Sequence, residues 1–254
     1  MWNVAVEAAP RSVDLFNGVL LLGMKNGSIA QMAMTADGSA EPNIIMKSHC
    51  DGEVWAMEVI DFEDESKRVI TAADDNRLLV YDPLARTVLC EGQVSAAKKS
   101  KKKKGKAGGF KGGASTQSSQ PPECQCRAVA YSASLQDLAV AQNNGIVTIR
   151  SIDWDKVNAG EAGALDNVTK TLFKTVKKAE WIEAMSYSPC GEMLAVGSHD
   201  NFIYVLDTKK KYSEKTMRKL TGHSSFITSF DWSIDSKWIR SNCGAYELLF
   251  YNVT

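Results

Sequence analysis

The 254-residue chain lacks most features that mark a secreted, membrane-spanning or disulfide-stabilised protein. Its apolar stretches, such as Val19 to Leu22, have the length of a strand, whereas a membrane-spanning helix needs roughly 20 apolar residues. The start, M-W-N-V-A-V-E, has neither the basic beginning nor the long apolar centre of a secretory signal. Six cysteines are too few for a disulfide scaffold in a chain this long, so we expect reduced cysteines and an intracellular location.

Groups that carry catalysis or bind metal are also sparse. The three histidines, His49, His199 and His223, are widely separated, and we interpret them as network or turn residues. Cys124 and Cys126 enclose a single residue, and no second pair follows at the spacing of zinc ligands. No Ser-His-Asp order, phosphate-binding glycine loop or pair of carboxylates stands in a convincing context. We therefore expect no enzymatic activity, no metal and no cofactor.

Acidic residues are missing from one long stretch, Gly92 to Pro122, which carries eight lysines instead. These are Lys98, Lys99, Lys101, Lys102, Lys103, Lys104, Lys106 and Lys111. Because the whole chain has no net charge, the +8 of this stretch leaves −8 on the remainder. Low hydrophobicity and charge of one sign prevent a packed core, so we predict a disordered basic insertion over residues 92–123.

Two interpretations of these lysines stay open. The functional one is electrostatic attachment to an acidic polymer, such as an acidic protein tail or a nucleic acid. The other is a solvated spacer without a partner. Phe110 is the one aromatic residue among the lysines, which argues against a stacking platform for nucleic acid bases. A nuclear-localisation signal at Lys101 to Lys104 is weakly supported because such runs are common.

A turn followed by a short apolar strand recurs five times along the chain. The copies begin at Asn26, Asp75, Asn144, Asp200 and Ala245, which are 49, 69, 56 and 45 residues apart. Asp-Asn and Asn-Gly pairs tolerate the left-handed backbone of tight hairpin turns. The intervals approach the period of about 40–45 residues of a propeller blade, and the longest one accommodates the basic insertion.

This repetition predicts an all-β chain that forms a β-propeller of about five blades. We expect residues 1–254 to form one partial, open propeller, since no fourth strand follows Tyr251. The expected blades span residues 1–46, 47–91, 124–153, 175–212 and 219–254. Trp55, Trp181 and Trp232 occupy first-strand positions and are expected in the core. Trp154, before a loop rich in glycine and alanine, is a candidate for an exposed partner contact.

Gly222-His223 and the strand endings Tyr81-Asp82 and Leu206-Asp207 resemble WD-repeat propellers, in which Gly-His and Trp-Asp stand at these places. The resemblance implies a buried hydrogen-bonded network of His, Ser or Thr, a turn Asp and the Trp. His49, Asp75 and Tyr81 offer such a set. The other expected members of these networks are Asp200 and His223. Since Ala245 stands at the acidic position of the last repeat, we expect a degenerate network there.

A more specific resemblance is to the echinoderm microtubule-associated protein-like family, over residues 179–252. It is carried by G-S-H-D-N-F-I-Y-V-L-D at 197–207, L-T-G-H-S-S-F-I-T at 220–228 and A-Y-E-L-L-F-Y at 245–251. Gly52 to Trp55 and Cys126 to Ala130 look like earlier blades of the same family. The family's hydrophobic motif near the start of its first propeller and its coiled coil are missing here.

The family resemblance implies a function. It implies paired propellers that bind microtubules or tubulin, with a cytoplasmic and cytoskeletal location that can include the cilium or axoneme. Other proteins would bind the propeller faces, and we expect neither nucleic acid nor membrane as a partner. The alternative is a general WD-repeat scaffold in a nucleic-acid-binding or ubiquitin-ligase assembly.

Overall fold

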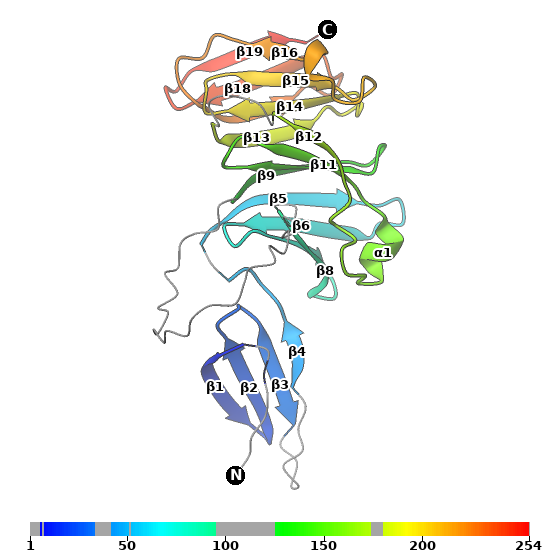
Figure 1. The fold of residues 1–254 in the computed structure, drawn as a ribbon, viewed down its shortest axis with the longest axis vertical. Helices are drawn as coiled ribbons and strands as arrows, with labels where there is room; N and C mark the ends of the chain where they lie inside the picture. Colours follow the sequence, from blue (N-terminus) through cyan, green and yellow to red (C-terminus); the bar gives the residue numbers. More distant parts are fainter. Residues whose placement is uncertain are drawn as a thin grey trace, which may run out of the picture.

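Antiparallel sheets stacked one on the next make up the computed structural model of the protein (Figure 1). The structure describes residues 6, 8–33, 42–50, 52–94, 125–173 and 180–253. The eight lysines, and with them most of the predicted disordered insertion, lie outside these described residues. Among the described residues, no helix has the length and apolar character needed to cross a membrane.

Five sheets are described, and in each of them every strand pairs with the next one along the chain. The first comprises β1 (Pro10–Phe16), β2 (Val19–Met24), β3 (Ile29–Ala33) and β4 (Asn43–Met46). The second comprises β5 (Val54–Asp61), β6 (Lys67–Ala73), β7 (Arg77–Asp82) and β8 (Thr87–Gln93). The third comprises β9 (Cys126–Ser132), β10 (Asp137–Gln142), β11 (Val147–Ser151) and β12 (Val168–Leu172).

The fourth sheet comprises β13 (Ile182–Tyr187), β14 (Met193–Ser198), β15 (Ile203–Asp207) and β16 (Arg218–Leu220). The fifth has three strands, β17 (Ile227–Trp232), β18 (Trp238–Cys243) and β19 (Leu248–Asn252). The first and last sheets lie at opposite ends of the stack, so the arrangement is open (Figure 1). The predicted all-β, open propeller with about five blades is confirmed.

Two sheets run further than the sequence suggested. Helix α1 (Trp154–Asn158) and a loop separate β11 from β12, which places the outer strand of the third sheet beyond residue 153. In the fourth sheet, the 3-10 helix η1 (Glu214–Thr216) precedes β16, beyond residue 212. Residues 92 and 93, which we assigned to the insertion, belong to β8 and pair with β7.

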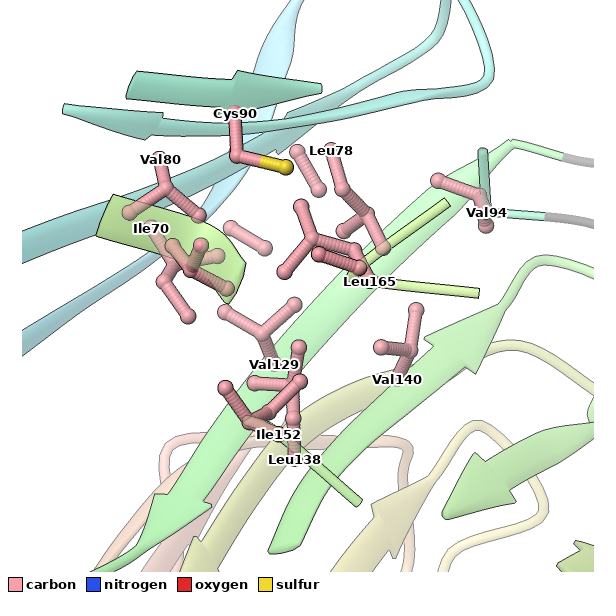
Figure 2. Packing of buried hydrophobic residues seen from close by; sticks show 14 of the residues in the cluster. Ile70, Leu78, Val80, Cys90, Val94, Val129, Leu138, Val140, Ile152 and Leu165 are labelled. Carbon is pink, nitrogen blue, oxygen red and sulfur yellow. The ribbon is translucent and has the colours of Figure 1, made fainter. Parts of the chain in front are cut away.

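The core lies between neighbouring sheets, because alternate side chains of each strand point to one face. Ile70, Leu78 and Val80 of the second sheet pack against the apolar face of the third (Figure 2). That face is formed by Val129, Leu138 and Val140, together with Ile152 and Leu165. Each such side chain contributes about 1.5–3 kcal/mol when fully buried. Similar clusters join the third sheet to the fourth and the fourth to the fifth.

A β-bulge recurs near the start of the innermost strand of every sheet. In the second sheet Val54 pairs with Ala73 and Ala56 with Ala72, which leaves the intervening Trp55 without a cross-strand partner. The residues at the same place in the five sheets are Arg11, Trp55, Arg127, Glu183 and Thr228. A bulge changes the direction of the side chain that it carries, so each of these residues departs from the in-and-out alternation of its strand.

The residues on either side of the lysine-rich insertion are held in place by hydrogen bonds. Val94 is fully buried, and its carbonyl oxygen accepts hydrogen bonds from Arg150 Nη2 at 2.5 Å and Gln142 Nε2 at 3.2 Å. On the other side, the Gln125 carbonyl accepts from the Asn143 N–H at 2.9 Å. The insertion therefore departs from fixed points on the second and third sheets.

Trp154 is buried, which contradicts its expected exposure. Asp153 caps the N-terminus of α1, its side chain accepting from the Lys156 N–H, and the helix turns Trp154 inward. There the indole Nε1 donates to Tyr131 Oη at 2.7 Å, and the ring meets Phe62 edge-on at 5.0 Å between centroids. Trp154 is thus a core residue and not a partner contact.

Candidate interaction surface

The N-terminal ends of the innermost strands β5, β9, β13 and β17 follow one another along one face of the stack. Aromatic and cationic side chains gather there and contact each other from sheet to sheet. We call this set the aromatic ladder: Trp55, Arg127, Trp181, His199 and Phe226. It is continuous across four sheets, and its large rings are partly exposed to solvent.

Arg127 is the centre of the ladder. Its guanidinium carbon lies 4.2 Å from the ring centroid of Trp55 and 4.3 Å from that of Trp181, so two indoles cover both sides of the cation. Its Nη2 donates to Gln125 Oε1 at 3.1 Å, and Nη1 lies 3.7 Å from the Asp74 carboxylate. Within the described part of the chain, Nε and Nη1 have no hydrogen-bond acceptor. Both atoms are buried, so the guanidinium holds the two indoles in place and is not itself open to a partner.

The ladder continues through His199, which sits in the turn after β14. Its ring is tilted against Trp181 at 5.4 Å between centroids and stacks on Phe226 at 4.7 Å. His199 Nε2 lies 3.1 Å from Glu183 Oε2, which fixes the orientation of the imidazole. This half of the ladder is thus held rigid before any partner arrives, which lowers the entropy cost of binding.

Trp55 and Trp181 are not core residues, in contrast to their prediction. Each has 42% of its surface exposed. Trp55 is carried by the bulge of β5, and Trp181 directly precedes β13, so strand alternation does not apply to either. Trp232 does pack against the core between the fourth and fifth sheets, as predicted, with its Nε1 donating to the Ser186 carbonyl at 3.3 Å.

The predicted network residues of the second sheet lie together. His49 Nδ1 is 3.0 Å from both carboxylate oxygens of Asp75, and His49 Nε2 is 2.9 Å from Thr71 Oγ1. Thr71 also hydrogen-bonds Tyr81. Burial opposes ionisation of Asp75, but the hydrogen bonds from His49 and from the Cys50 N–H hold the pKa of Asp75 below its usual value. The four side chains tie the turn, the second strand and the third strand together.

The fifth sheet has not lost its acid, as Ala245 had suggested. Glu247, two residues further on, takes the position and accepts from the Ser224 N–H at 2.8 Å and the Ser224 hydroxyl at 2.7 Å. His223 lies between Glu247 Oε2 at 3.4 Å and Ser241 Oγ at 2.7 Å. The expectation of a degenerate network in this sheet is therefore wrong, because a carboxylate with a longer side chain replaces the turn Asp.

Asp200 makes hydrogen bonds other than those expected of a network residue. It follows β14 in the turn to β15, where Oδ2 accepts from the Tyr204 hydroxyl at 2.5 Å and Oδ1 from the Phe202 N–H at 3.3 Å. The neighbouring His199 bonds Glu183 instead. Asp200 thus stabilises its own turn and does not form the His–acid pair of the second sheet.

His49→Ala and His223→Ala are expected to destabilise the protein by similar amounts, about 1–3 kcal/mol each, because each leaves a hydroxyl and a carboxylate without their histidine partner. Urea unfolding followed by circular dichroism measures this. His199→Ala is the matched control, since its histidine is half-buried and bonds the partly exposed Glu183. A cost for His223→Ala no greater than that of the control would contradict the network in the fifth sheet.

Sequence reasoning missed Arg127, Cys243 and Glu247. Arg127 reads as an ordinary strand residue until the bulge is known. Glu247 stands at a strand start, and only the turn geometry brings its carboxylate back to His223. Cys243 Sγ lies 3.1 Å from Glu247 Oε2, so the cysteine joins the same cluster. The number of residues in a turn does not reveal which side chains meet, so the sequence alone cannot show these contacts.

Stacked antiparallel meanders, with a His–Ser/Thr–acid network joining their turns, define a WD-repeat-type β-propeller. The profile described as "Echinoderm microtubule-associated protein second beta-propeller" matches residues 54–254, from the first residue of β5 onward. The chain belongs to this family of echinoderm microtubule-associated proteins, as its sequence motifs predicted.

Relatives with curated descriptions agree. The chain is 39% identical over 252 residues to the "Ciliary WD repeat-containing protein ctxp80" of Euplotoides octocarinatus, covering 99% of this chain and 31% of that protein. It is 53% identical over 77 residues to "Echinoderm microtubule-associated protein-like 4" of Mus musculus, covering 29% of this chain and 8% of that protein. With "Echinoderm microtubule-associated protein-like 1" of Homo sapiens it shares 48% identity over 115 residues, 44% of this chain and 14% of that protein. The chain thus spans less than a third of the length of these relatives.

Proposed function

We propose that the chain is a non-enzymatic interaction platform that binds tubulin or microtubules as part of a microtubule-associated protein. Its family and the names of its relatives support a cytoskeletal role, and the ciliary relative supports a location in the cilium or axoneme. Two elements would make the contact: the aromatic ladder as a rigid surface and the lysines as a cationic segment.

The observation that carries this proposal is the place where the insertion returns to the fold. Gln125, its first described residue on the C-terminal side, accepts a hydrogen bond from Arg127 at the centre of the ladder. Val94, on the N-terminal side, belongs to the same core cluster as Cys126 and Val129 of β9. One attachment point of the insertion therefore lies beside the ladder, and lysines joined to the fold there would attract an acidic polymer toward it. The acidic tails of tubulin have the required charge.

Energy of binding would come from the ladder. Tryptophan and arginine are the residue types that most often dominate protein interfaces, because they bury a large area and keep polar groups that hydrogen-bond a partner. Trp55 and Trp181 offer partly exposed rings, and the buried Arg127 between them keeps the two indoles in place. A polypeptide chain could cover the two rings while its acidic residues are attracted by the lysines.

Replacing both Trp55 and Trp181 with Ala should weaken microtubule co-sedimentation by about 30-fold, the equivalent of one strong interface residue. The control is Trp238→Ala, which removes a tryptophan with 44% exposure from the opposite end of the fifth sheet. The control should bind normally. Equal binding by all three proteins would show that the ladder does not contact microtubules.

A nucleic-acid-binding scaffold is the alternative, and the same variants test it. If RNA bound the full chain more tightly than microtubules did, the lysines would serve a nucleic acid and the proposed function would be wrong. The ladder argues against this outcome, because Arg127 covers one face of both indoles and Phe226 is stacked on His199, so no base could be held between two free rings.

A further inference from the structure

Three side chains with metal-binding chemistry converge in the fifth sheet. His223 precedes β17, Cys243 ends β18 and Glu247 precedes β19, and the nitrogen, sulfur and oxygen ligand atoms lie within 4.8 Å of one another. The tight turn between the last two strands brings this about. Its Tyr246 N–H donates to the Cys243 carbonyl at 3.0 Å, and Tyr246 has a left-handed backbone with φ of 63°. Cys243 and Glu247, four residues apart, consequently face the same point.

The donor set suits zinc. Imidazole nitrogen, thiolate sulfur and carboxylate oxygen are all established zinc ligands, and a thiolate selects against magnesium and calcium. Cys243 Sγ is 3.1 Å and His223 Nδ1 is 3.4 Å from Glu247 Oε2. Such separations are compatible with three corners of a small tetrahedron around one ion, given metal–ligand distances of roughly 2.0–2.3 Å.

Surrounding groups orient the three donors as supporting groups do in zinc sites. Ser241 Oγ lies 2.7 Å from His223 Nε2, so a proton on Nε2 is used there and Nδ1 faces the cluster. The Ser224 N–H and hydroxyl hold the Glu247 carboxylate.

The charge of the cluster distinguishes it from the corresponding network in the second sheet. There, Asp75 lies 3.8 Å from the Arg77 guanidinium, which offsets its charge, and Cys50 Sγ is 3.8 Å away. In the fifth sheet, His223 is the one basic residue that pairs with Glu247 among the described residues. A carboxylate beside a thiol, without a permanent cation, is an arrangement that a divalent ion would stabilise.

We propose that His223, Cys243 and Glu247 form a zinc-binding site, with His223 Nδ1, Cys243 Sγ and a Glu247 carboxylate oxygen as ligands. The Glu247 side chain is 34% exposed, so the fourth corner opens toward solvent and takes a water molecule. Zinc binding releases the thiol proton of Cys243. The ion links the loop before β17 to the turn between β18 and β19, and this is independent of tubulin binding.

Cobalt(II) is the probe, because a cobalt–thiolate bond gives a charge-transfer absorption in the near ultraviolet and a tetrahedral site gives intense visible bands. The full chain is freed of metal with a chelator, desalted and titrated. We expect saturation at one cobalt per chain, bleaching of the bands by one equivalent of zinc, and a rise in melting temperature with zinc.

Variants locate the site. Cys243→Ser should abolish the charge-transfer band, and Glu247→Gln should weaken cobalt binding at least 10-fold. Cys190→Ser, which changes an exposed cysteine, is the matched control and should titrate like the unchanged chain. Circular dichroism shows that each variant is folded. Absence of tetrahedral cobalt bands in the unchanged chain, or a charge-transfer band that survives Cys243→Ser, would overturn the proposal.

Discussion

Arg150→Met should destabilise the protein more than any other substitution considered above. Arg150 is almost fully buried, and its guanidinium donates to the Leu165 carbonyl at 2.9 Å and to the Val94 carbonyl at 2.5 Å. Methionine fills much of the same volume but donates no hydrogen bond. The substitution removes both charged hydrogen bonds and leaves Val94 with the Gln142 amide as its donor; each lost bond costs about 1–3 kcal/mol, so the free energy of unfolding should fall by several kcal/mol.

The reason for this cost is that Arg150 joins three segments. Val94 is the last described residue before the lysines, Leu165 belongs to the loop after α1, and Arg150 lies in β11. Burial lowers the pKa of Arg150, although an arginine remains charged at neutral pH. Asp166, at 3.6 Å, supplies the nearby negative charge. Without the guanidinium, the loop at Leu165 and the segment at Val94 would lose the hydrogen bonds that attach them to β11.

Urea unfolding monitored by far-ultraviolet circular dichroism measures the change. Arg240→Met is the control, because Arg240 is exposed and pairs with the exposed Asp231 at 2.5 Å. Exposed ion pairs contribute about 0–1 kcal/mol, so this variant should stay close to the unchanged protein. If the two variants were equally stable, Arg150 would not hold the loop and the insertion in place.

Deleting residues 95–120 should weaken microtubule binding strongly at low salt while leaving the melting temperature nearly unchanged. The deletion removes all eight lysines, and these lysines carry a charge of +8 against −8 on the rest of the chain. Their attraction for acidic tails extends over roughly a Debye length, about 8 Å at physiological ionic strength, and fades as salt rises. The salt dependence of co-sedimentation should therefore flatten in the deleted protein.

Stability should change little because doubling the length of a flexible loop costs only about 0.6 kcal/mol in closure entropy. A second variant, with the eight lysines changed to Gln, keeps the length of the insertion and removes its charge. It should bind as weakly as the deletion. Binding that persists undiminished at low salt in both variants would assign the interaction to the rigid face and leave the lysines as a solvated spacer.

The repeated strands and turns could be predicted from sequence because hairpin turns have strong local chemistry. Asp75-Asn76 and Asn144-Gly145 stand at turns with left-handed residues, at Asn76 and Gly145. The side-chain directions at the ends of the inner strands could not be predicted. A bulge shifts the alternation by one residue, and no pattern around Trp55 marks its position.

The site was harder to predict than the fold for a related reason. Its contacts join residues of different sheets, such as Arg127 between Trp55 and Trp181. Trp154 misled for the opposite reason, since a neighbouring loop rich in small residues suggested exposure whereas a hydrogen bond to Tyr131 draws the indole inward. The acid of the fifth sheet was expected at position 245 because two of the other repeats have it at that place in the turn. Glu247 supplies it instead, since its longer side chain reaches back to His223.

The recurrent bulge has a consequence for how this face of the protein can change over evolutionary time. A bulged residue has no partner on the neighbouring strand, so its replacement leaves the register of the two strands intact. Arg11, Trp55, Arg127, Glu183 and Thr228 already differ in size, charge and polarity at equivalent places. Each sheet thus carries one position at which the side chain can vary while the strand pairing stays the same. A new partner preference can arise by single substitutions at these positions without disturbing the core.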